Sequence, residues 1–341
     1  MSNFESQGGV QAQTAKVPGA EWPETLISVQ DLNQARQRIS GACLRTPVLS
    51  VPNPSTGDAL WVKAEALQRT GSFKLRGVAN AIAALDSSES TKGVITYSAG
   101  NHGRALAFAA RRAGIPATVV MPETASMLKV RQTKSEGATV LLLPPDEIVT
   151  HTEHLSAERG MTFIPPFDDA QVIAGQGTIG LELLEQVEGL DVVLVPVGGG
   201  GLAAGVATAI KKHRPSAKVI VVEPELAGDL AESFAVGRRV AWTREQTRRT
   251  IADGLRSPMV GDLPWEHIKF LVDDVVTVSD DSIVSAMRWL AEHAKIIVEP
   301  SGAVATAAVL QHSQKLPAGT TVTVATGGNI DLETFVSIVG T

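Results

Sequence analysis

A lysine and a run of glycines are the features of this sequence that point most directly to chemistry. Lys74 lies in the segment RTGSFKLRG (69–77), and four consecutive glycines occupy 198–201 in PVGGGGLAAG. A lysine amine can form a Schiff base with a carbonyl group. Glycines have no Cβ atom, so their backbone N–H groups can come close to an anion at the start of a helix. The two features predict a phosphate site and a reactive amine.

Other interpretations of these residues stay open at this level. Lys74 could be a solvated residue at the start of a helix. The glycines could form a tight strand-to-helix turn, although such a turn needs only one or two of them. Gly199, Gly201 and Ala204 also match the dinucleotide-binding pattern G-x-G-x-x-A, and Glu223 lies where a ribose-binding acid is expected. The glycine motif alone does not identify the ligand.

The alternation of short apolar runs and amphipathic segments predicts an α/β fold. Apolar strands that alternate with helices are typical of parallel sheets buried on both faces. The runs form two clusters, which predicts two sheets. The expected strands cover 94–98, 117–122, 138–143, 191–197, 218–224 and 321–326, and the expected helices cover 103–114, 126–137 and 201–213.

Glycine-rich turns follow three of these strands. They lie at 98–103 (SAGNHG), 197–201 (VGGGG) and 326–329 (TGGN). In open α/β sheets, ligands bind outside the carboxyl ends of the strands. We therefore expect the three turns to form walls of one site.

The composition is that of a globular protein. Of 341 residues, 44% are apolar and 19% are charged, with 30 Lys and Arg against 36 Asp and Glu. This mildly acidic balance predicts no nucleic-acid partner and no membrane partner. No run of about 18 apolar residues indicates a membrane span, and the N-terminus lacks the pattern of a signal peptide. Cys43 is the only cysteine, which excludes a disulfide framework and predicts a small buried hydrophobe in a cytoplasmic protein.

Seven segments, taken as a set, resemble the fold-type II enzymes that depend on pyridoxal 5'-phosphate (PLP). The group to which they are most similar is the threonine/serine dehydratases and serine racemases. The resemblance extends from about Leu44 to Asp331. In chain order, the segments are LQRTGSFKLRG, SAGNHG, VIAGQGTIGLELL, PVGGGGLAAG, TIADGL, VEPSGA and ATGGNID.

This resemblance implies an architecture of two domains, each with a mostly parallel twisted sheet flanked by helices. Residues 25–92 and 169–341 would form a large PLP-binding domain, and residues 93–168 a small mobile domain. Residues 1–24, rich in Gly, Gln and Ser, are expected to be a flexible tail. A homodimer is also implied.

The resemblance also implies roles for individual residues. Lys74 would bind PLP covalently and act as the base on one face of the cofactor, Asn101 would hydrogen-bond the PLP 3-hydroxyl, and Thr326 would face the pyridine nitrogen. The residues implied in cofactor binding are Phe73, Lys74, Asn101, Gly198, Gly199, Gly200, Gly201, Gly254, Glu299 and Thr326. Those implied in binding the substrate carboxylate are Ser98, Ala99, Gly100, Asn101 and His102.

Four of these residues keep a purely structural alternative. Thr326 could be a buried structural hydroxyl, and Asn101 a turn residue, because Asn tolerates left-handed conformations. His102 could be a hydrogen-bonded wall residue instead of a proton donor or acceptor. Glu299 precedes Pro300 and could simply end a strand.

A possible cation site lies in EPELAGD (223–229). In the serine racemase branch, the matching positions bind a divalent cation, which implies Glu223, the carbonyl of Ala227, and Asp229 as ligands here. Two carboxylates and a carbonyl, completed by waters, suit Mg²⁺ or Ca²⁺. The alternative is an acidic, solvated start of a helix.

Ala99 distinguishes between the two reactions of this group. Racemases of the group carry a serine at this position, on the cofactor face opposite the lysine, where it exchanges the second proton. A methyl group has no proton to give. The sequence therefore favours a dehydratase that eliminates water from a small β-hydroxy amino acid, such as L-threonine, L-serine or a 3-hydroxyaspartate-like compound, to give a 2-oxo acid and ammonia. The alternatives are an amino-acid racemase, a catalytically idle PLP-binding module and, more remotely, a dinucleotide-binding protein.

Overall fold

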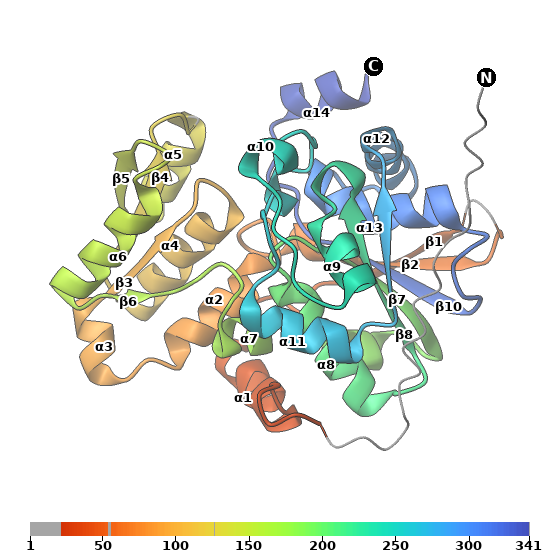
Figure 1. Cartoon of the computed structure of the whole chain (residues 1–341), viewed down its shortest axis with the longest axis horizontal. Coiled ribbons are helices and arrows are strands. Elements are labelled where there is room, and N and C mark those ends of the chain that lie inside the picture. Colours follow the sequence, from red (N-terminus) through yellow and green to blue (C-terminus); the bar gives the residue numbers. More distant parts are fainter. Residues whose placement is uncertain (1–21, 54–55, 126, 341) are drawn as a thin grey trace.

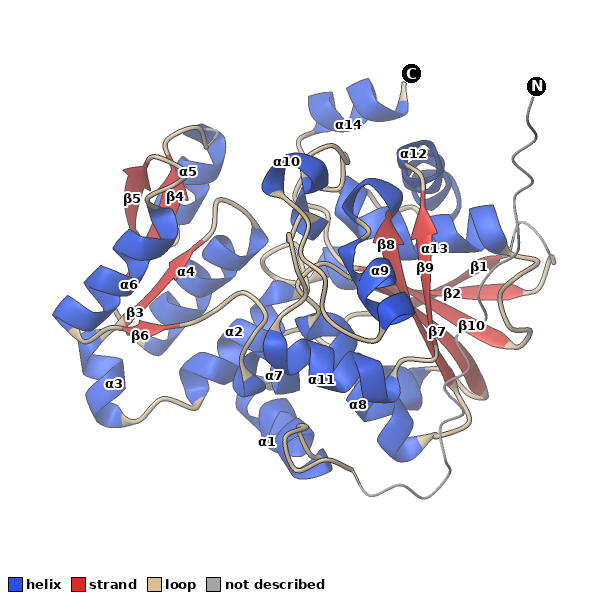
Figure 2. Ribbon diagram, in the orientation of Figure 1, coloured by secondary structure: helices blue, strands red, loops and turns tan. Residues whose placement is uncertain are grey.

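The computed structural model describes residues 22–53, 56–125 and 127–340 (Figures 1 and 2). Among these residues, one sheet has six strands in the order β1-β2-β10-β7-β8-β9, and a second has four in the order β5-β4-β3-β6. The strands are β1 (Val48–Pro52), β2 (Ala59–Ala64), β3 (Val94–Tyr97), β4 (Ala117–Pro122), β5 (Thr139–Leu143), β6 (Thr162–Phe163), β7 (Leu190–Pro196), β8 (Lys218–Pro224), β9 (Asp274–Val278) and β10 (Thr320–Ala325).

Helices cover both sheets, as Figure 2 shows. The α-helices are α1 (Val29–Ile39), α2 (Lys74–Ala83), α3 (Ser87–Lys92), α4 (Asn101–Ala113), α5 (Met127–Ser135), α6 (Ile148–Arg159), α7 (Ala170–Gln186), α8 (Gly201–His213), α9 (Asp229–Val236), α10 (Arg244–Thr247), α11 (Asp262–Leu271), α12 (Asp280–Trp289), α13 (Pro300–His312) and α14 (Leu332–Val339). Shorter turns of helix are η1 (Glu65–Leu67), η2 (Glu225–Ala227), η3 (Asp253–Leu255) and η4 (Leu290–Ala294). The α/β fold class predicted from the sequence is confirmed.

The order of strands brings separate glycine-rich turns to one end of the large sheet, where the carboxyl ends of the parallel strands lie. β10 lies between β2 and β7 and is parallel to both. The turns that follow β7 and β10 therefore leave the sheet side by side, at the carboxyl ends of their strands. Only β1, among the described strands of this sheet, pairs in the antiparallel sense.

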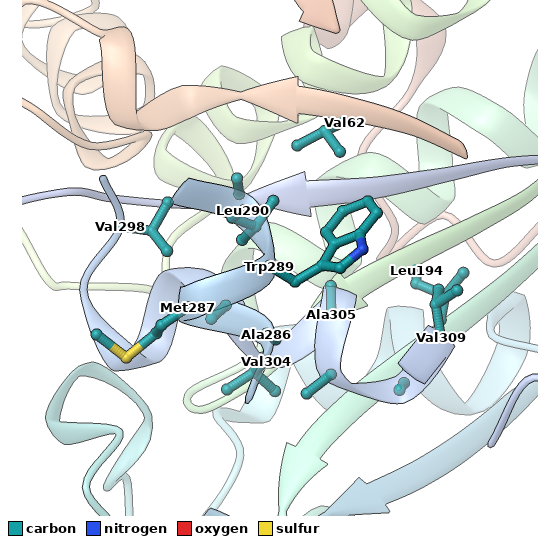
Figure 3. Packing of buried hydrophobic residues seen from close by; sticks show 14 of the residues in the cluster. Val62, Leu194, Ala286, Met287, Trp289, Leu290, Val298, Val304, Ala305 and Val309 are labelled. Carbon is teal, nitrogen blue, oxygen red and sulfur yellow. The ribbon is translucent and has the colours of Figure 1, made fainter. Parts of the chain in front are cut away.

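Apolar layers pack on both faces of the six-stranded sheet. On one face, Met287 of α12 and Val304 of α13 belong to one apolar cluster with Leu194 of β7 (Figure 3). On the other face, Ile179 of α7 and Val206 of α8 belong to a separate apolar cluster with neighbouring strand residues. Successive side chains of a strand point to opposite faces, so an apolar strand such as β7 joins both layers. The sheet is thereby a rigid support for the turns at the carboxyl ends of its strands.

The small sheet consists of β3, β4, β5 and β6 and is wholly parallel in its described strands. These strands fall within residues 93–168, which the sequence predicts as the small domain; the domain boundaries themselves stay a prediction. The predicted tail of residues 1–24 lies outside the described residues except for its end, where Trp22 packs edge-on against Phe270.

Two further expectations from the sequence can be compared with the structure. Cys43 is buried, and burial raises the pKa of its thiol to about 12, as expected for a residue that packs as a small hydrophobe. In residues 22–53, 56–125 and 127–340, no helix combines the length and apolar character needed to cross a membrane.

Candidate active site

A cavity of about 600 Å³ is lined by residues that follow strands of both sheets, among them β3, β7 and β10. This volume suits a cofactor together with a small substrate. All the residues that the sequence assigned to cofactor and substrate binding line the cavity, from six separate regions of the chain. They are Phe73, Lys74, Ser98, Ala99, Gly100, Asn101, His102, Gly198, Gly199, Gly200, Gly201, Gly254, Glu299 and Thr326.

Lys74 is the first residue of α2 and presents its amine to this cavity. Its Nζ donates a hydrogen bond to the carbonyl of Pro166 at 2.8 Å and lies 5.1 Å from the centre of the Phe73 ring. No carboxylate within 4.0 Å pairs with Nζ among the described residues. Burial lowers the pKa of Lys74 to about 8, because the charged form is poorly solvated. Roughly a tenth of the amine is then neutral, and nucleophilic, at pH 7, far more than for a solvated lysine.

A buried ionic network fixes the helix that carries Lys74. The Arg76 guanidinium is fully buried and donates to both oxygens of Glu65 and both oxygens of Glu182. Lys63 reaches the same Glu182 carboxylate from β2. This network joins α2 to η1, β2 and α7. Removing one partner of a buried ion pair costs about 3–5 kcal/mol, so the start of α2 is held firmly.

The four glycines form a turn with no room for side chains, at the start of α8. A Cβ atom on Gly199 would lie 2.1 Å from the ring of Phe167, and one on Gly198 would lie 3.0 Å from the Cα of Leu255. Gly200 has a φ of +93°, a region that other residues rarely adopt. The four glycines line the cavity without side chains, so their backbone can come close to an anion at the helix start.

A chain of polar side chains crosses the cavity wall at Asn101. Its Nδ2 donates to Glu299 at 2.6 Å, and its Oδ1 accepts from Asn329 at 2.7 Å. Asn329 in turn accepts from Arg104 at 2.8 Å. Burial raises the pKa of Glu299 to about 7, and the hydrogen bond from Asn101 opposes the rise. Both ends of the Asn101 amide are thus oriented, which is more than a turn residue needs.

His102 is buried and neutral. Its Nε2 lies 3.0 Å from the carbonyl of Ile164 and donates to it, so Nδ1 carries no proton; Nδ1 has no hydrogen-bond partner among the described residues. Burial, reinforced by the nearby positive charge of Lys74, lowers the pKa of His102 to about 3. A proton-donating role at neutral pH is therefore disfavoured, in keeping with a wall residue.

Thr326 and Gly254 lie on either side of Ser301. The Thr326 hydroxyl is buried and donates to the Ser301 carbonyl at 3.2 Å, while the Ser301 hydroxyl accepts from the backbone N–H of Gly254 at 2.8 Å. The Thr326 oxygen keeps lone pairs on the cavity side, and it carries no charge. A neutral hydroxyl, unlike a carboxylate, would not force a proton onto a ring nitrogen.

These residues fit PLP. The bare glycine turn provides for a phosphate, and a partly neutral lysine amine provides for a carbonyl carbon. The unpaired Nδ1 of His102 is a buried polar atom that awaits a partner. Asn101, Glu299 and Thr326 line the same cavity with neutral or titratable polar groups, as the edge of a heteroaromatic ring requires.

The three positions proposed for a cation lie elsewhere, outside the residues that line the cavity. Glu223 is the second-to-last residue of β8, is fully buried, and accepts from the N–H groups of Leu230 and Ala231, so it is not aimed at the glycine turn as a ribose-binding acid would be. Asp229 is also buried, and its Oδ2 has no hydrogen-bond partner within the described part of the chain. Burial raises the pKa of both, that of Asp229 to about 7, and the charge of Asp229 adds to the rise at Glu223.

Residues 39–327 match the sequence profile of the family described as pyridoxal-phosphate dependent enzymes. The chain belongs to this family, and it is a PLP-dependent enzyme. It is 41% identical over 315 residues to a catabolic L-threonine dehydratase of Staphylococcus aureus strain N315, covering 90% of each chain. It is 39% identical over 323 residues to a serine racemase of Oryza sativa subsp. indica, covering 92% of this chain and 94% of that protein. The solved serine racemase of Dictyostelium discoideum superposes with a TM-score of 0.84 at 41% identity, over 90% of this chain and 100% of that one.

The structure adds cavity residues that the sequence analysis did not single out. Pro166 accepts the hydrogen bond of Lys74, and Phe167 packs under the glycine turn; both precede α7 in an irregular segment without periodicity. Asn329 and Arg104 complete the chain of hydrogen bonds at Asn101. Asn329 lies in the TGGN turn (326–329), and Arg104 lies one helical turn after Asn101 in α4. Both positions could therefore have been found from the sequence, because they lie in or next to motifs that were predicted to form the site.

Proposed function

We propose that this chain eliminates water from a small β-hydroxy amino acid and releases a 2-oxo acid and ammonia. The observation that carries the proposal is the pair of side chains in one cavity: the Lys74 amine, with its lowered pKa, and the methyl group of Ala99. One base is sufficient for elimination. Racemisation needs a second proton donor on the opposite face, and Ala99 has none to offer.

Each residue of the cavity has a defined task in this proposal. When bound, PLP supplies a conjugated ring that withdraws electrons from the substrate Cα. The neutral Lys74 amine takes the Cα proton as the general base. The segment from Ser98 to His102, which leads into the start of α4, would bind the substrate carboxylate through its backbone N–H groups. The glycine turn at 198–201 would hold the cofactor phosphate, and Asn101 and Thr326 would orient the ring.

The proposed reaction can be tested with purified protein and a panel of β-hydroxy amino acids. We expect ammonia and 2-oxo acid to appear in equal amounts from at least one member of a set containing serine, threonine and 3-hydroxyaspartate, each as both enantiomers and, where they exist, both diastereomers. Ammonia and keto-acid assays give the measurement. If PLP binds but no compound yields ammonia, the chain binds the cofactor without acting as a dehydratase.

We also propose a divalent cation bound by Glu223, Asp229 and the carbonyl of Ala227. Two buried carboxylates side by side are unfavourable unless a proton or a cation compensates them. No group of three or more His, Cys, Asp and Glu side chains is placed to hold a metal in the described ranges. The site would therefore depend on two carboxylates, one carbonyl and waters, which suits Mg²⁺ or Ca²⁺. A homodimer stays a prediction.

Added Mg²⁺ or Ca²⁺ should raise the melting temperature of the protein. A ligand that binds only the folded state stabilises it increasingly as its concentration rises above Kd. The variant Glu223→Ala/Asp229→Ala should lose this dependence on metal concentration, whereas Glu225→Ala, at an exposed acid of the same segment, should retain it. Thermal unfolding with EDTA and with metal gives the measurement. A parent protein that is indifferent to both would exclude a cation site.

A further inference from the structure

A second cavity, of about 280 Å³, is lined mainly by arginines. Its lining consists of Arg244, Thr247, Arg248, Arg256 and Pro258. The arginines carry three positive charges, and the lining contains no acidic residue. Neither the reaction proposed above nor the cation site uses Arg244 or Arg248. Figure 1 shows α10, which carries part of this lining, in the region between α5 and α12.

Hydrogen bonds fix the walls of this cavity and leave guanidinium N–H groups available to bind a ligand. Thr247 is buried and donates its hydroxyl proton to the carbonyl of Arg256 at 3.1 Å. The Arg256 guanidinium donates Nε and Nη2 to the carbonyl of Thr250, which leaves Nη1 for another acceptor. These contacts fix α10 and Arg256 relative to each other.

Arg244 and Arg248 are exposed, and neither is held by another protein group in the described part of the chain. Within residues 22–53, 56–125 and 127–340, neither guanidinium makes a hydrogen bond or an ion pair. They are four residues apart, so they project from the same side of α10. Like charges at this spacing are mildly destabilising. Three arginines that line one cavity, with no acidic residue in its lining, form a site that an anion would complete.

We propose that this cavity binds a small molecule through a phosphate or pyrophosphate group. Guanidinium groups bind phosphate oxygens in a bidentate, planar manner. Three positive charges favour a ligand with two or more negative charges. An amino-acid zwitterion has no net charge, and a 2-oxo acid derived from serine or threonine has only one negative charge. Serine, threonine and the 2-oxo acids derived from them are therefore poor matches for the site.

Arg256 connects this site to the active-site cavity, because it lines both. Gly254 and Leu255, which precede it, also line the active-site cavity. An anion that engages the free Nη1 of Arg256 would restrain this segment. A ligand bound in this second cavity can thus alter how the active site binds its substrate, although the two ligands do not touch.

The test is a titration of the PLP-loaded protein with inorganic pyrophosphate in metal-free buffer, followed by isothermal calorimetry. PLP loading keeps the phosphate cradle at 198–201 filled, and sodium chloride at matched ionic strength controls for screening. We expect one site per chain. Arg244→Ala and Arg248→Ala should each weaken binding roughly tenfold or more, as expected for loss of a charge-assisted hydrogen bond.

The matched control is Arg249→Ala. Arg249 is an exposed arginine of the same segment, but its Nε donates to the carbonyl of Gln246 and it does not line the cavity. This variant should bind pyrophosphate within about twofold of the parent. The visible absorption of bound PLP confirms that each variant is folded and loaded. Absence of binding to the parent, or equal weakening in all three variants, would overturn the proposal, and neither result depends on dehydratase activity.

Discussion

Replacing Lys74 by alanine should lower kcat at least about 10³-fold, because the residue would serve both as covalent anchor and as base. In the parent protein, borohydride reduction followed by peptide mapping should place the pyridoxyl group on Lys74. The physical basis is the position of its amine in the cavity and its pKa of about 8, which makes a neutral nucleophile available.

Lys129 provides the control for this experiment. It is a second lysine that lines the same cavity, but it forms an ion pair with Asp253 at 3.5 Å. Lys129→Ala should therefore retain the label on Lys74. A label on Lys129 or on any other lysine, or the absence of a label in a protein that binds PLP, would contradict the assignment of Lys74.

Gly199→Ala should weaken PLP binding at least about tenfold and destabilise the protein by about 1–3 kcal/mol, the usual cost of overpacking. The new Cβ would lie 2.1 Å from the Phe167 ring, so the turn or the ring must move. Either movement disturbs the N–H groups that face the cavity. PLP titration monitored by absorbance, with thermal unfolding in parallel, gives the measurement.

Gly41→Ala is the matched control. Gly41 is exposed, and a Cβ atom there would meet nothing within 4 Å. Its PLP affinity and stability should stay near those of the parent. If Gly199→Ala behaves like Gly41→Ala, the glycine turn is not the tight cradle that we describe.

The elements nearest the site were predictable because each has a strong local pattern. The expected strand 117–122 and helix 201–213 coincide with β4 and α8, and the expected strand 191–197 differs from β7 by one residue at each end. Buried parallel strands are continuous apolar runs, and glycines mark where they end. The three glycine-rich turns were correctly expected to form walls of one cavity.

The sequence could not give the partners of these elements. The insertion of β10 between β2 and β7 is a long-range choice that no local pattern encodes. The two residues of β6 are too few to show any periodicity. The link from Asn101 to Glu299 joins residues 198 positions apart, and the low pKa of His102 depends on burial. Such properties arise only when the chain is packed.

The central claim is that elimination predominates over racemisation, and it rests on Ala99. The direct measurement is chiral chromatography, combined with a keto-acid assay, of the parent enzyme acting on L-serine or L-threonine. A proton donor or acceptor contributes roughly 10²–10⁴-fold to a rate, so its absence should be evident in the ratio of products. We predict 2-oxo acid with little D-serine or threonine epimer, and a larger racemised share for Ala99→Ser. Racemisation that is faster than keto-acid formation in the parent enzyme would contradict the account.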